Sequence, residues 1–294
     1  MTREIKVGRV RIGGRAPVRI QSMTKIDTRD VSATIRQIKE LELLGCEIVR
    51  IAVKDFQAAS AIKKIKKKTR IPIVADIHFD HRLALVAIEN GADKIRLNPG
   101  NIHKKEQIIE VAKLAKKRRV PIRIGVNSGS VKTKGKKVKA DHLVGAALAY
   151  IKVLEKAGFY DIIVSLKASD VLTTIEACRK FSKRSKYPLH LGITAAGPLS
   201  AGLVKSSIGI GVLLLEGIGD TIRVSLTGDP CEEVIAAKNI LQALNLRQFA
   251  PEIISCPECG RCQVDLQRIV TDIERAITHY ALGVRRAAWP KVAI

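Results

Sequence analysis

The feature that most constrains the fold of this chain is a unit repeated eight times: a short apolar run, a turn and an amphipathic stretch. The runs are rich in β-branched residues and begin at residues 18, 47, 71, 94, 121, 161, 189 and 221. The stretches between them, such as 31–44, 102–117, 143–156 and 232–244, carry apolar residues at helical spacing. Strands that are apolar throughout are typical of parallel sheets covered on both faces. Eight such units predict an α/β fold, a (β/α)8 TIM barrel over residues 1–250, with a doubly wound open sheet as the alternative.

Two segments flank this pattern. Residues 5–7 and 9–12 are strand-like, precede the first unit and are expected to cap the lower end of the barrel. Past Pro251 the repeat stops, and a cysteine-rich turn, an amphipathic stretch over 264–280 and a strand-like ending at 291–294 follow. About 45 residues bury too little surface to form a core alone. Residues 251–294 are therefore predicted to be the beginning of a second, incomplete domain.

The charge of the chain permits an anionic partner without identifying it. Lys and Arg number 52 against 28 Asp and Glu in 294 residues, a formal net charge of +24. Aromatic residues make up only 3%, which disfavours modules that stack nucleic-acid bases. The sequence has no apolar stretch of membrane-spanning length and no targeting signal, so we expect a cytoplasmic protein without a membrane or nucleic-acid partner.

Charged residues recur near the ends of the predicted strands. Arg50, Arg96, Arg123 and Lys167 occupy equivalent places in four units. Burying a charge is costly unless it is paired or meets a ligand. Guanidinium groups that converge on the carboxyl ends of barrel strands suit a diphosphate, because they bind its oxygens bidentately. The alternative is a polar layer inside the barrel.

Neutral and acidic side chains accompany these cations. The amides of Asn98 and Asn127 can fix substrate hydroxyls, and Asp76 and His78, two residues apart on one strand, can share a proton.

Three cysteines form the sharpest local motif. Cys256, Cys259 and Cys262 follow one another at C-x2-C spacing, and no second pair of ligands completes a zinc site. The spacing is instead typical of part of an iron–sulfur ligand run. Three protein ligands with one iron left open would suit a catalytic cluster.

The motifs together resemble one family. VRIQSMT at 18, VADIHFD at 74, IRLNPGNI at 95, IRIGVNSGS at 122, IVSLKAS at 163, LHLGIT at 189, GIGDTIRVSLTGDP at 217 and SCPECGR at 255 resemble the 4-hydroxy-3-methylbut-2-enyl diphosphate synthases of the non-mevalonate isoprenoid pathway. The resemblance extends along the whole chain. It implies a TIM barrel followed by an iron–sulfur (α+β) domain, here without its C-terminal end.

The resemblance also implies an activity. Members of the family are oxidoreductases acting on CH or CH2 groups. They reductively open 2-C-methyl-D-erythritol 2,4-cyclodiphosphate to 4-hydroxy-3-methylbut-2-enyl diphosphate. Two electrons arrive from ferredoxin or flavodoxin through a [4Fe-4S] cluster, and the family is usually a homodimer.

Matching motifs transfer roles to residues of this chain. By resemblance, the diphosphate would be held by Arg50, His78, Arg96, Arg123, Lys167 and Ser225. Asp76, Asn98 and Asn127 would line the substrate, and Cys256 and Cys259 would be cluster ligands.

Two departures from the family pattern qualify this expectation. Ala195 stands where the family has a glutamate beside the substrate that acts as a proton donor. The chain also stops before the segment that supplies the family's third cysteine and a glutamate ligand. A truncated gene, a second chain carrying the missing segment, and Cys262 as the third thiolate are the three explanations. Glu216 is a weak candidate for the missing acid.

Two other functions stay open from sequence alone. The first is a catalytically impaired or split diphosphate-binding barrel. The second is a basic nucleic-acid-binding protein with a zinc knuckle.

Overall fold

A computed structural model of the chain describes residues 1–131, 137–281 and 291–293. It divides into two compact units, Met1–Ile240 and Leu241–Ile294, and the boundary predicted near Pro251 falls within the second.

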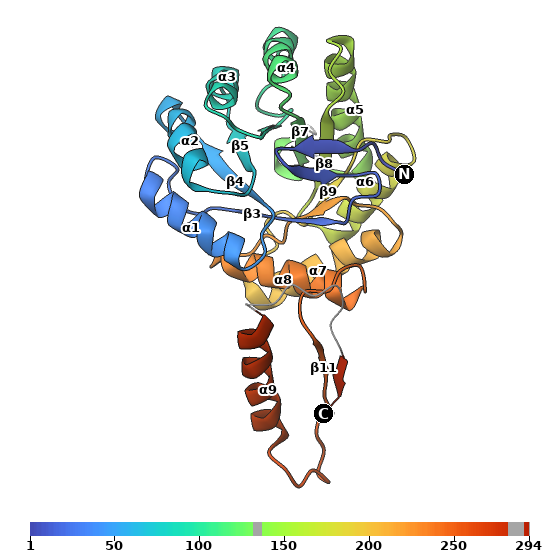
Figure 1. Cartoon of the computed structure of the whole chain (residues 1–294). Helices are drawn as coiled ribbons and strands as arrows, with labels where there is room; N and C mark the ends of the chain where they lie inside the picture. Colours follow the sequence, from blue (N-terminus) through green and yellow to red (C-terminus); the bar gives the residue numbers. More distant parts are fainter. Residues whose placement is uncertain (132–136, 282–290, 294) are drawn as a thin grey trace. The chain divides into compact units, whose positions relative to one another are not determined.

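The first unit is built around eight parallel strands (Figure 1). Their order in the sheet is β8-β7-β6-β5-β4-β3-β10-β9. An isolated parallel bridge between Val164 and Leu189 joins the two ends of this order, so the sheet closes on itself. The strands are β3 (Arg19–Met23), β4 (Ile48–Val53), β5 (Ile73–Ile77), β6 (Lys94–Leu97), β7 (Ile122–Asn127), β8 (Ile162–Lys167), β9 (His190–Leu191) and β10 (Thr221–Ile222). The predicted barrel is confirmed, and the open sheet is excluded.

Helices follow the strands around the barrel. They are α1 (Val31–Leu43), α2 (Phe56–Lys68), α3 (His81–Glu89), α4 (Lys105–Arg118), α5 (Ala140–Lys156), α6 (Val171–Ser182), α7 (Leu199–Leu215) and α8 (Pro230–Ala243). Four of them begin at an aspartate whose carboxylate accepts a backbone N–H of the first turn: Asp30, Asp55, Asp80 and Asp170. Such caps stabilise a helix start by about 1 kcal/mol each. These caps therefore set the last residue of four loops at the carboxyl end of the barrel.

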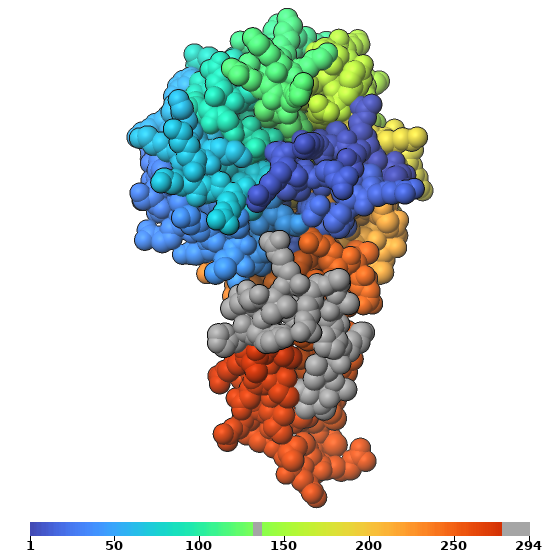
Figure 2. All heavy atoms as spheres, viewed as in Figure 1, coloured from blue at the N-terminus to red at the C-terminus, as the bar shows by residue number. Residues whose placement is uncertain are grey.

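An antiparallel hairpin closes the opposite end of the barrel. It is formed by β1 (Ile5–Val7) and β2 (Val10–Ile12). Ile5, Val7 and Ile12 are buried in one cluster with Ile48, Val74 and Ile163 from the barrel strands. In Figure 2 the N-terminal residues, coloured dark blue, cover this side of the barrel surface. The predicted cap is therefore confirmed.

The second unit contains β11 (Glu252–Ile254), α9 (Leu266–Ala281) and β12 (Lys291–Ala293). Strands β11 and β12 pair in parallel, with Ile253 opposite Val292. The helix and the last strand were predicted from sequence, whereas β11 was not. None of the helices in the described ranges has both the length and the apolar composition that crossing a bilayer requires.

Candidate active site

Four neighbouring barrel strands place charged side chains on the inside of the barrel. The strand register sets Asp76 of β5 opposite Arg96 of β6, and Arg96 opposite Arg123 of β7. Side chains alternate between the two faces of a strand, so these residues share the inner face. Arg50, on β4, reaches the same carboxylate from the other side. Arg223, which follows β10, is the fourth arginine of this group. We call Arg50, Arg96, Arg123 and Arg223 the arginine cluster.

Asp76 lies at the centre of the cluster. Its Oδ1 accepts a hydrogen bond of 3.0 Å from Nη1 of Arg96, and its Oδ2 lies 3.6 Å from Nε of Arg50. Nε2 of His78 is 3.5 Å from the same Oδ2. Burial alone raises the pKa of Asp76, but the charges of Arg50 and Arg96 outweigh it and hold this pKa below its usual range. Asp76 is thus a fixed anion that orients the cations around it.

Arg123 has the least satisfied side chain of the cluster. The residue is only 1% exposed, yet its Nε and Nη1 have no hydrogen-bond partner within the described part of the chain. Burial lowers its pKa, and the nearby charges of Arg50 and Arg96 add to this effect. Buried donors without partners are rare in folded proteins and are costly. A ligand with several anionic oxygens would satisfy them.

Two further cations face the same interior. Lys167, at the end of β8, is buried and donates to the backbone oxygen of Leu191 at 3.2 Å. Arg223 follows β10, and its Nη2 lies 3.2 Å from Oε1 of Glu233, a buried residue of the first turn of α8. Arg223 lies in the predicted strand-end run, but neither it nor Glu233 was among the predicted site residues. Arg223 lies two residues before Ser225, and a glutamate on the apolar face of a helix would have been the signal for its partner.

Three predicted polar residues lie one step nearer the carboxyl ends of the strands. Asn98 follows Arg96 by two residues, is 6% exposed, and accepts the N–H of Gly100 through its Oδ1 at 3.1 Å. Asn127, opposite Lys167 in the register, and Ser225 are partly exposed. They lie beyond the cluster, toward the carboxyl ends of the strands.

Two glycines make room for the cations. A Cβ on Gly125 would lie 2.4 Å from Nε of Arg96, whose Nη2 donates to the Gly125 oxygen at 3.0 Å. A Cβ on Gly192 would lie 2.6 Å from Nζ of Lys167 and 2.3 Å from the Arg223 oxygen. Side chains at either position would displace the cationic groups of the site.

Replacing the central carboxylate tests this electrostatic arrangement. We expect Asp76→Asn to destabilise the barrel by about 3 kcal/mol, because it leaves Arg96 and Arg50 buried without a counter-charge. Urea unfolding followed by circular dichroism measures the difference. Glu216→Gln, which removes an exposed carboxylate, is the matched control and is expected to leave the unfolding midpoint unchanged. Equal stability of Asp76→Asn and the unaltered protein would contradict the assigned pairing.

The structure does not bring the candidate acid Glu216 to this site. Glu216 ends α7, which runs back toward the amino ends of the strands, and its Oε2 accepts from Nε of Arg179 at 2.9 Å on the outer surface. Arg179 lowers the pKa of Glu216. Ala195, in contrast, follows β9 in an exposed position at the carboxyl end. Its φ of 51° is unusual for a residue other than glycine.

The three clustered cysteines lie in the second unit, between β11 and α9. All three are exposed, and the N–H of Cys262 donates to the backbone oxygen of Cys259 at 2.9 Å. Backbone and side-chain hydrogen bonds from Arg261 lower the pKa of Cys259. Within the described residues, no three His, Cys, Asp or Glu side chains converge enough to hold one metal ion. The thiols are accessible, but they do not form a three-ligand site by themselves.

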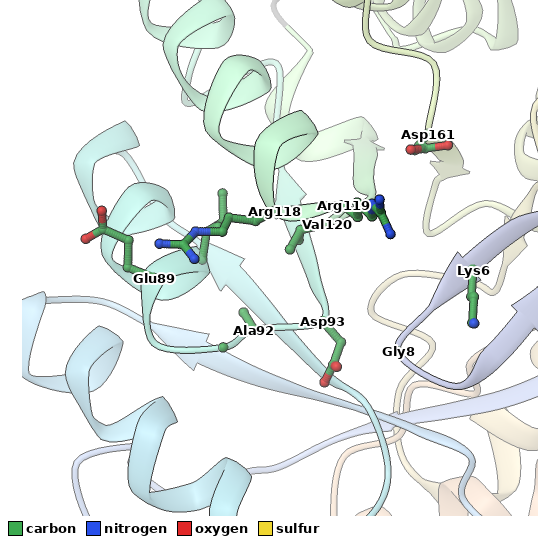
Figure 3. Close-up of a pocket in the computed structure, with 11 residues that line it drawn as sticks. Lys6, Gly8, Glu89, Ala92, Asp93, Arg118, Arg119, Val120 and Asp161 are labelled. Carbon is green, nitrogen blue, oxygen red and sulfur yellow. The ribbon is translucent and has the colours of Figure 1, made fainter.

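A separate depression lies at the amino ends of β6, β7 and β8 (Figure 3). Its volume is about 810 Å³, and Lys6, Asp93, Arg119 and Asp161 are among its lining residues. Charges of both signs line it, and Lys6, Arg119 and Asp161 are exposed. The arginine cluster is the stronger candidate for a binding site, because Arg96 and Arg123 are buried and two donors of Arg123 have no partner within the described residues.

Comparison with known proteins agrees with the barrel and its residues. Residues 2–238 match the family model described as the GcpE TIM-barrel domain. The chain belongs to the GcpE family. The match covers the strands that carry the arginine cluster.

Curated relatives of the family share more than half of their aligned residues with this chain. The protein of Caldanaerobacter subterraneus subsp. tengcongensis is 55% identical over 283 residues, which is 95% of this chain and 80% of the relative. That of Thermodesulfovibrio yellowstonii is 56% identical over 281 residues, covering 94% and 80%. Both relatives are named 4-hydroxy-3-methylbut-2-en-1-yl diphosphate synthase (flavodoxin).

Solved structures resemble the chain in fold alone. Dihydropteroate synthase from Yersinia pestis superposes with a TM-score of 0.59 at 10% identity and covers 83% of this chain and 100% of its own. The Xanthomonas albilineans enzyme in complex with 7,8-dihydropteroate gives 0.61 at 13% identity, covering 82% and 98%. At such low identity the likeness supports the barrel and says nothing of the reaction.

Proposed function

We propose that the chain catalyses the reductive opening of 2-C-methyl-D-erythritol 2,4-cyclodiphosphate to 4-hydroxy-3-methylbut-2-enyl diphosphate. The relatives' shared name and the membership in the GcpE family support this reaction. The structural observation that carries it is Arg123, a buried cation with two unpartnered N–H groups among the described residues. Neither alternative from the sequence, the impaired barrel or the nucleic-acid-binding zinc knuckle, gains support from the relatives.

The residues of the barrel would bind and orient the substrate. Arg50, Arg96, Arg123 and Lys167 would hold the phosphate oxygens, with His78 and Ser225 at the rim. Asp76 keeps the guanidinium groups of Arg50 and Arg96 in place before the substrate arrives, because it already binds both. Asn98 and Asn127 would meet the hydroxyl groups. Preorganised cations of this kind stabilise negative charge without reorganising during the reaction.

The cysteines have the chemistry that an iron–sulfur cluster requires of its ligands. Thiolates are the usual ligands of such clusters, and Cys256, Cys259 and Cys262 are all exposed and free of disulfides. Cys256 and Cys259 would hold the [4Fe-4S] cluster, with Cys262 as the candidate third ligand. Bound there, the cluster would relay two electrons to the substrate.

The partners follow from the same proposal. The relatives' names support flavodoxin as the electron donor, and ferredoxin is the alternative. The protein would act as a homodimer in the cytoplasm.

Anaerobic reconstitution with iron and sulfide, followed by turnover, tests the function. With reduced flavodoxin and the cyclic diphosphate, we expect formation of 4-hydroxy-3-methylbut-2-enyl diphosphate, detected by mass spectrometry. Substrate binding without turnover in a cluster-loaded protein would favour the impaired barrel. Stoichiometric zinc with salt-sensitive RNA binding, and no affinity for the cyclic diphosphate, would overturn the proposal.

Serine substitutions separate the three cysteines. We expect Cys256→Ser and Cys259→Ser each to lose most of the bound iron after reconstitution, because a serine hydroxyl is a poor ligand for this cluster. Iron per chain and the visible absorbance of the cluster are the measurements. Cys231→Ser, which alters a partly exposed cysteine of the barrel unit, is the control. Full iron content in both variants would remove these thiols from the ligand set, and the same test decides the role of Cys262.

A further inference from the structure

A second layer of buried polar side chains lies beneath the arginine cluster. Lys94 opens β6 two residues before Arg96, so it shares the inner face of the barrel one step nearer its closed end. Its neighbours in this layer are Gln21 of β3 and the hydrogen-bonded pair of His190 Nδ1 and Thr221 Oγ1, 2.8 Å apart. All four residues are at most 1% exposed. The proposed binding roles use none of these four residues.

Lys94 lacks the partners that an ammonium group needs. Its Nζ donates to Oε1 of Gln21 at 3.2 Å, and the described residues offer it no other hydrogen bond. A charged lysine carries three N–H donors, so two of them would be buried without acceptors. Gln21 is neutral, and its Nε2 is itself unpartnered within the described ranges. The geometry therefore favours the uncharged amine.

The charges around Lys94 act in the same direction. Complete burial lowers its pKa well below the usual value, and the neighbouring cations Arg123 and Arg50 lower it further. Asp76, the buried anion of the layer above, is already bound to Arg96 and lies close to Arg50. Among the described residues, no anion of the unliganded interior is therefore left to compensate a positive charge on Lys94.

We propose that Lys94 is a neutral amine in the unliganded barrel and takes up one proton when a diphosphate occupies the arginine cluster. The inference rests on the proposed function, because it needs an anion at that cluster. The lone pair of Nζ would form an N–H bond with a proton from solvent, and no other bond changes. Lys94 would thus supply a charge to the complex that is not present in the free protein.

The chemistry of the ligand assigns any proton uptake on binding to the protein. A cyclic diphosphate brings two negative charges, one on each phosphate, and neutralises the cations that repel a charge on Lys94. Each phosphorus carries a single acidic oxygen that stays ionised at neutral pH. The ligand itself therefore takes up no proton, and any uptake on binding belongs to the protein.

Two other buried groups compete for the proton. His190 is fully buried, its Nε2 has no partner among the described residues, and burial together with Lys167, Arg123 and Lys94 lowers its pKa. Burial and Arg123 likewise lower the pKa of Lys167. His190 already has a neutral partner in Thr221 for its Nδ1, and Lys167 donates to the Leu191 oxygen. Variants must distinguish Lys94 from His190.

Isothermal titration calorimetry in buffers of different ionisation enthalpy counts the protons. Titrating the full chain with 2-C-methyl-D-erythritol 2,4-cyclodiphosphate at neutral pH, we expect uptake of about one proton per ligand bound. The heat of binding reports on the proposed function, and its dependence on the buffer reports on Lys94. Absence of binding would therefore contradict the proposed function, whereas binding without proton uptake would overturn only the present inference.

Two variants assign the proton. Lys94→Met keeps the volume of the side chain and removes the amine, and we expect it to fold, to bind the ligand more weakly and to take up no proton. His190→Gln is the matched control and is expected to retain the uptake. Uptake that persists in Lys94→Met and disappears in His190→Gln would overturn the assignment. The 13Cε shift of Lys94, followed by NMR in the unaltered protein with and without ligand, gives a second reading that does not depend on how the variants fold.

The pH dependence of the affinity shows whether Lys94 gains or loses a proton when the ligand binds. The ligand raises the pKa of Lys94, so binding is strongest below the pKa of the free protein and weakens as the pH rises toward that of the complex. Between these two values the Kd is expected to increase by about tenfold per pH unit. The Kd of Lys94→Met is expected to stay nearly constant over the same range. An unaltered protein whose affinity is independent of pH would contradict the inference.

Discussion

Arg123→Met is expected to lower the affinity for the cyclic diphosphate by about a thousandfold while leaving the barrel at least as stable as before. Loss of a buried, desolvated contact with a charged ligand costs roughly 2–5 kcal/mol. The free protein, in contrast, loses a fully buried cation whose Nε and Nη1 have no partner among the described residues. Replacing such a group by an apolar side chain of similar length stabilises the fold by about 1–3 kcal/mol.

Calorimetry and urea unfolding measure the two effects on the same variant. Arg179→Met is the matched control, since it removes an arginine of the outer surface that pairs with Glu216. We expect the control to bind the ligand as the unaltered protein does. Unchanged ligand affinity in Arg123→Met would exclude the arginine cluster as the binding site, and severe destabilisation would show that Arg123 has a structural partner.

Ala195→Glu is expected to raise kcat of the reconstituted enzyme by about 10²-fold or more, the usual contribution of a positioned general acid. The resemblance to the synthase family places a glutamate at this position beside the substrate. The structure leaves the position exposed at the carboxyl end of the barrel, where a longer side chain meets no obstruction from burial. Its left-handed backbone is equally accessible to alanine and glutamate, so the exchange adds little strain.

Ala195→Gln separates acidity from size. Glutamine has the shape of glutamate without its proton, and we expect this variant to keep the turnover of the unaltered chain. The pH profile of the glutamate variant should acquire a new limb in which the rate falls as the carboxyl group loses its proton. A glutamate variant no faster than the glutamine variant would mean that another group of the chain already supplies the proton.

The strands of the barrel were predictable because their apolar runs are continuous and evenly spaced. The last two runs are a partial exception, since β9 and β10 are each only two residues long, against predicted runs of 189–194 and 221–227. Gly192 directly follows β9 with a φ of 150°, and a Cβ there would lie 2.3 Å from the oxygen of Arg223.

The charged residues of the candidate site were predictable from the sequence, whereas the ion pairs that they form were not. Arg50, Arg96 and Arg123 stand out in apolar runs, but which of them Asp76 binds depends on strand register, which periodicity does not reveal. Glu233 escaped notice because its helix reads as an outer element, although the residue is buried and binds Arg223. Glu216 ends the helix before the last strand, and in a barrel of parallel strands such a helix end lies at the amino rim, away from the cluster.

The hairpin formed by β1 and β2 determines how small molecules and ions reach the barrel interior. Ile5, Val7 and Ile12 close the amino end with an apolar plug, so water and protons enter from the carboxyl end. A diphosphate held by the arginine cluster would occupy that same entrance. The proton that we propose for Lys94 would therefore arrive before the diphosphate or together with it, and it would stay isolated from solvent until the product departs. The order in which the proton and the diphosphate enter the barrel would then affect the rate of ligand binding.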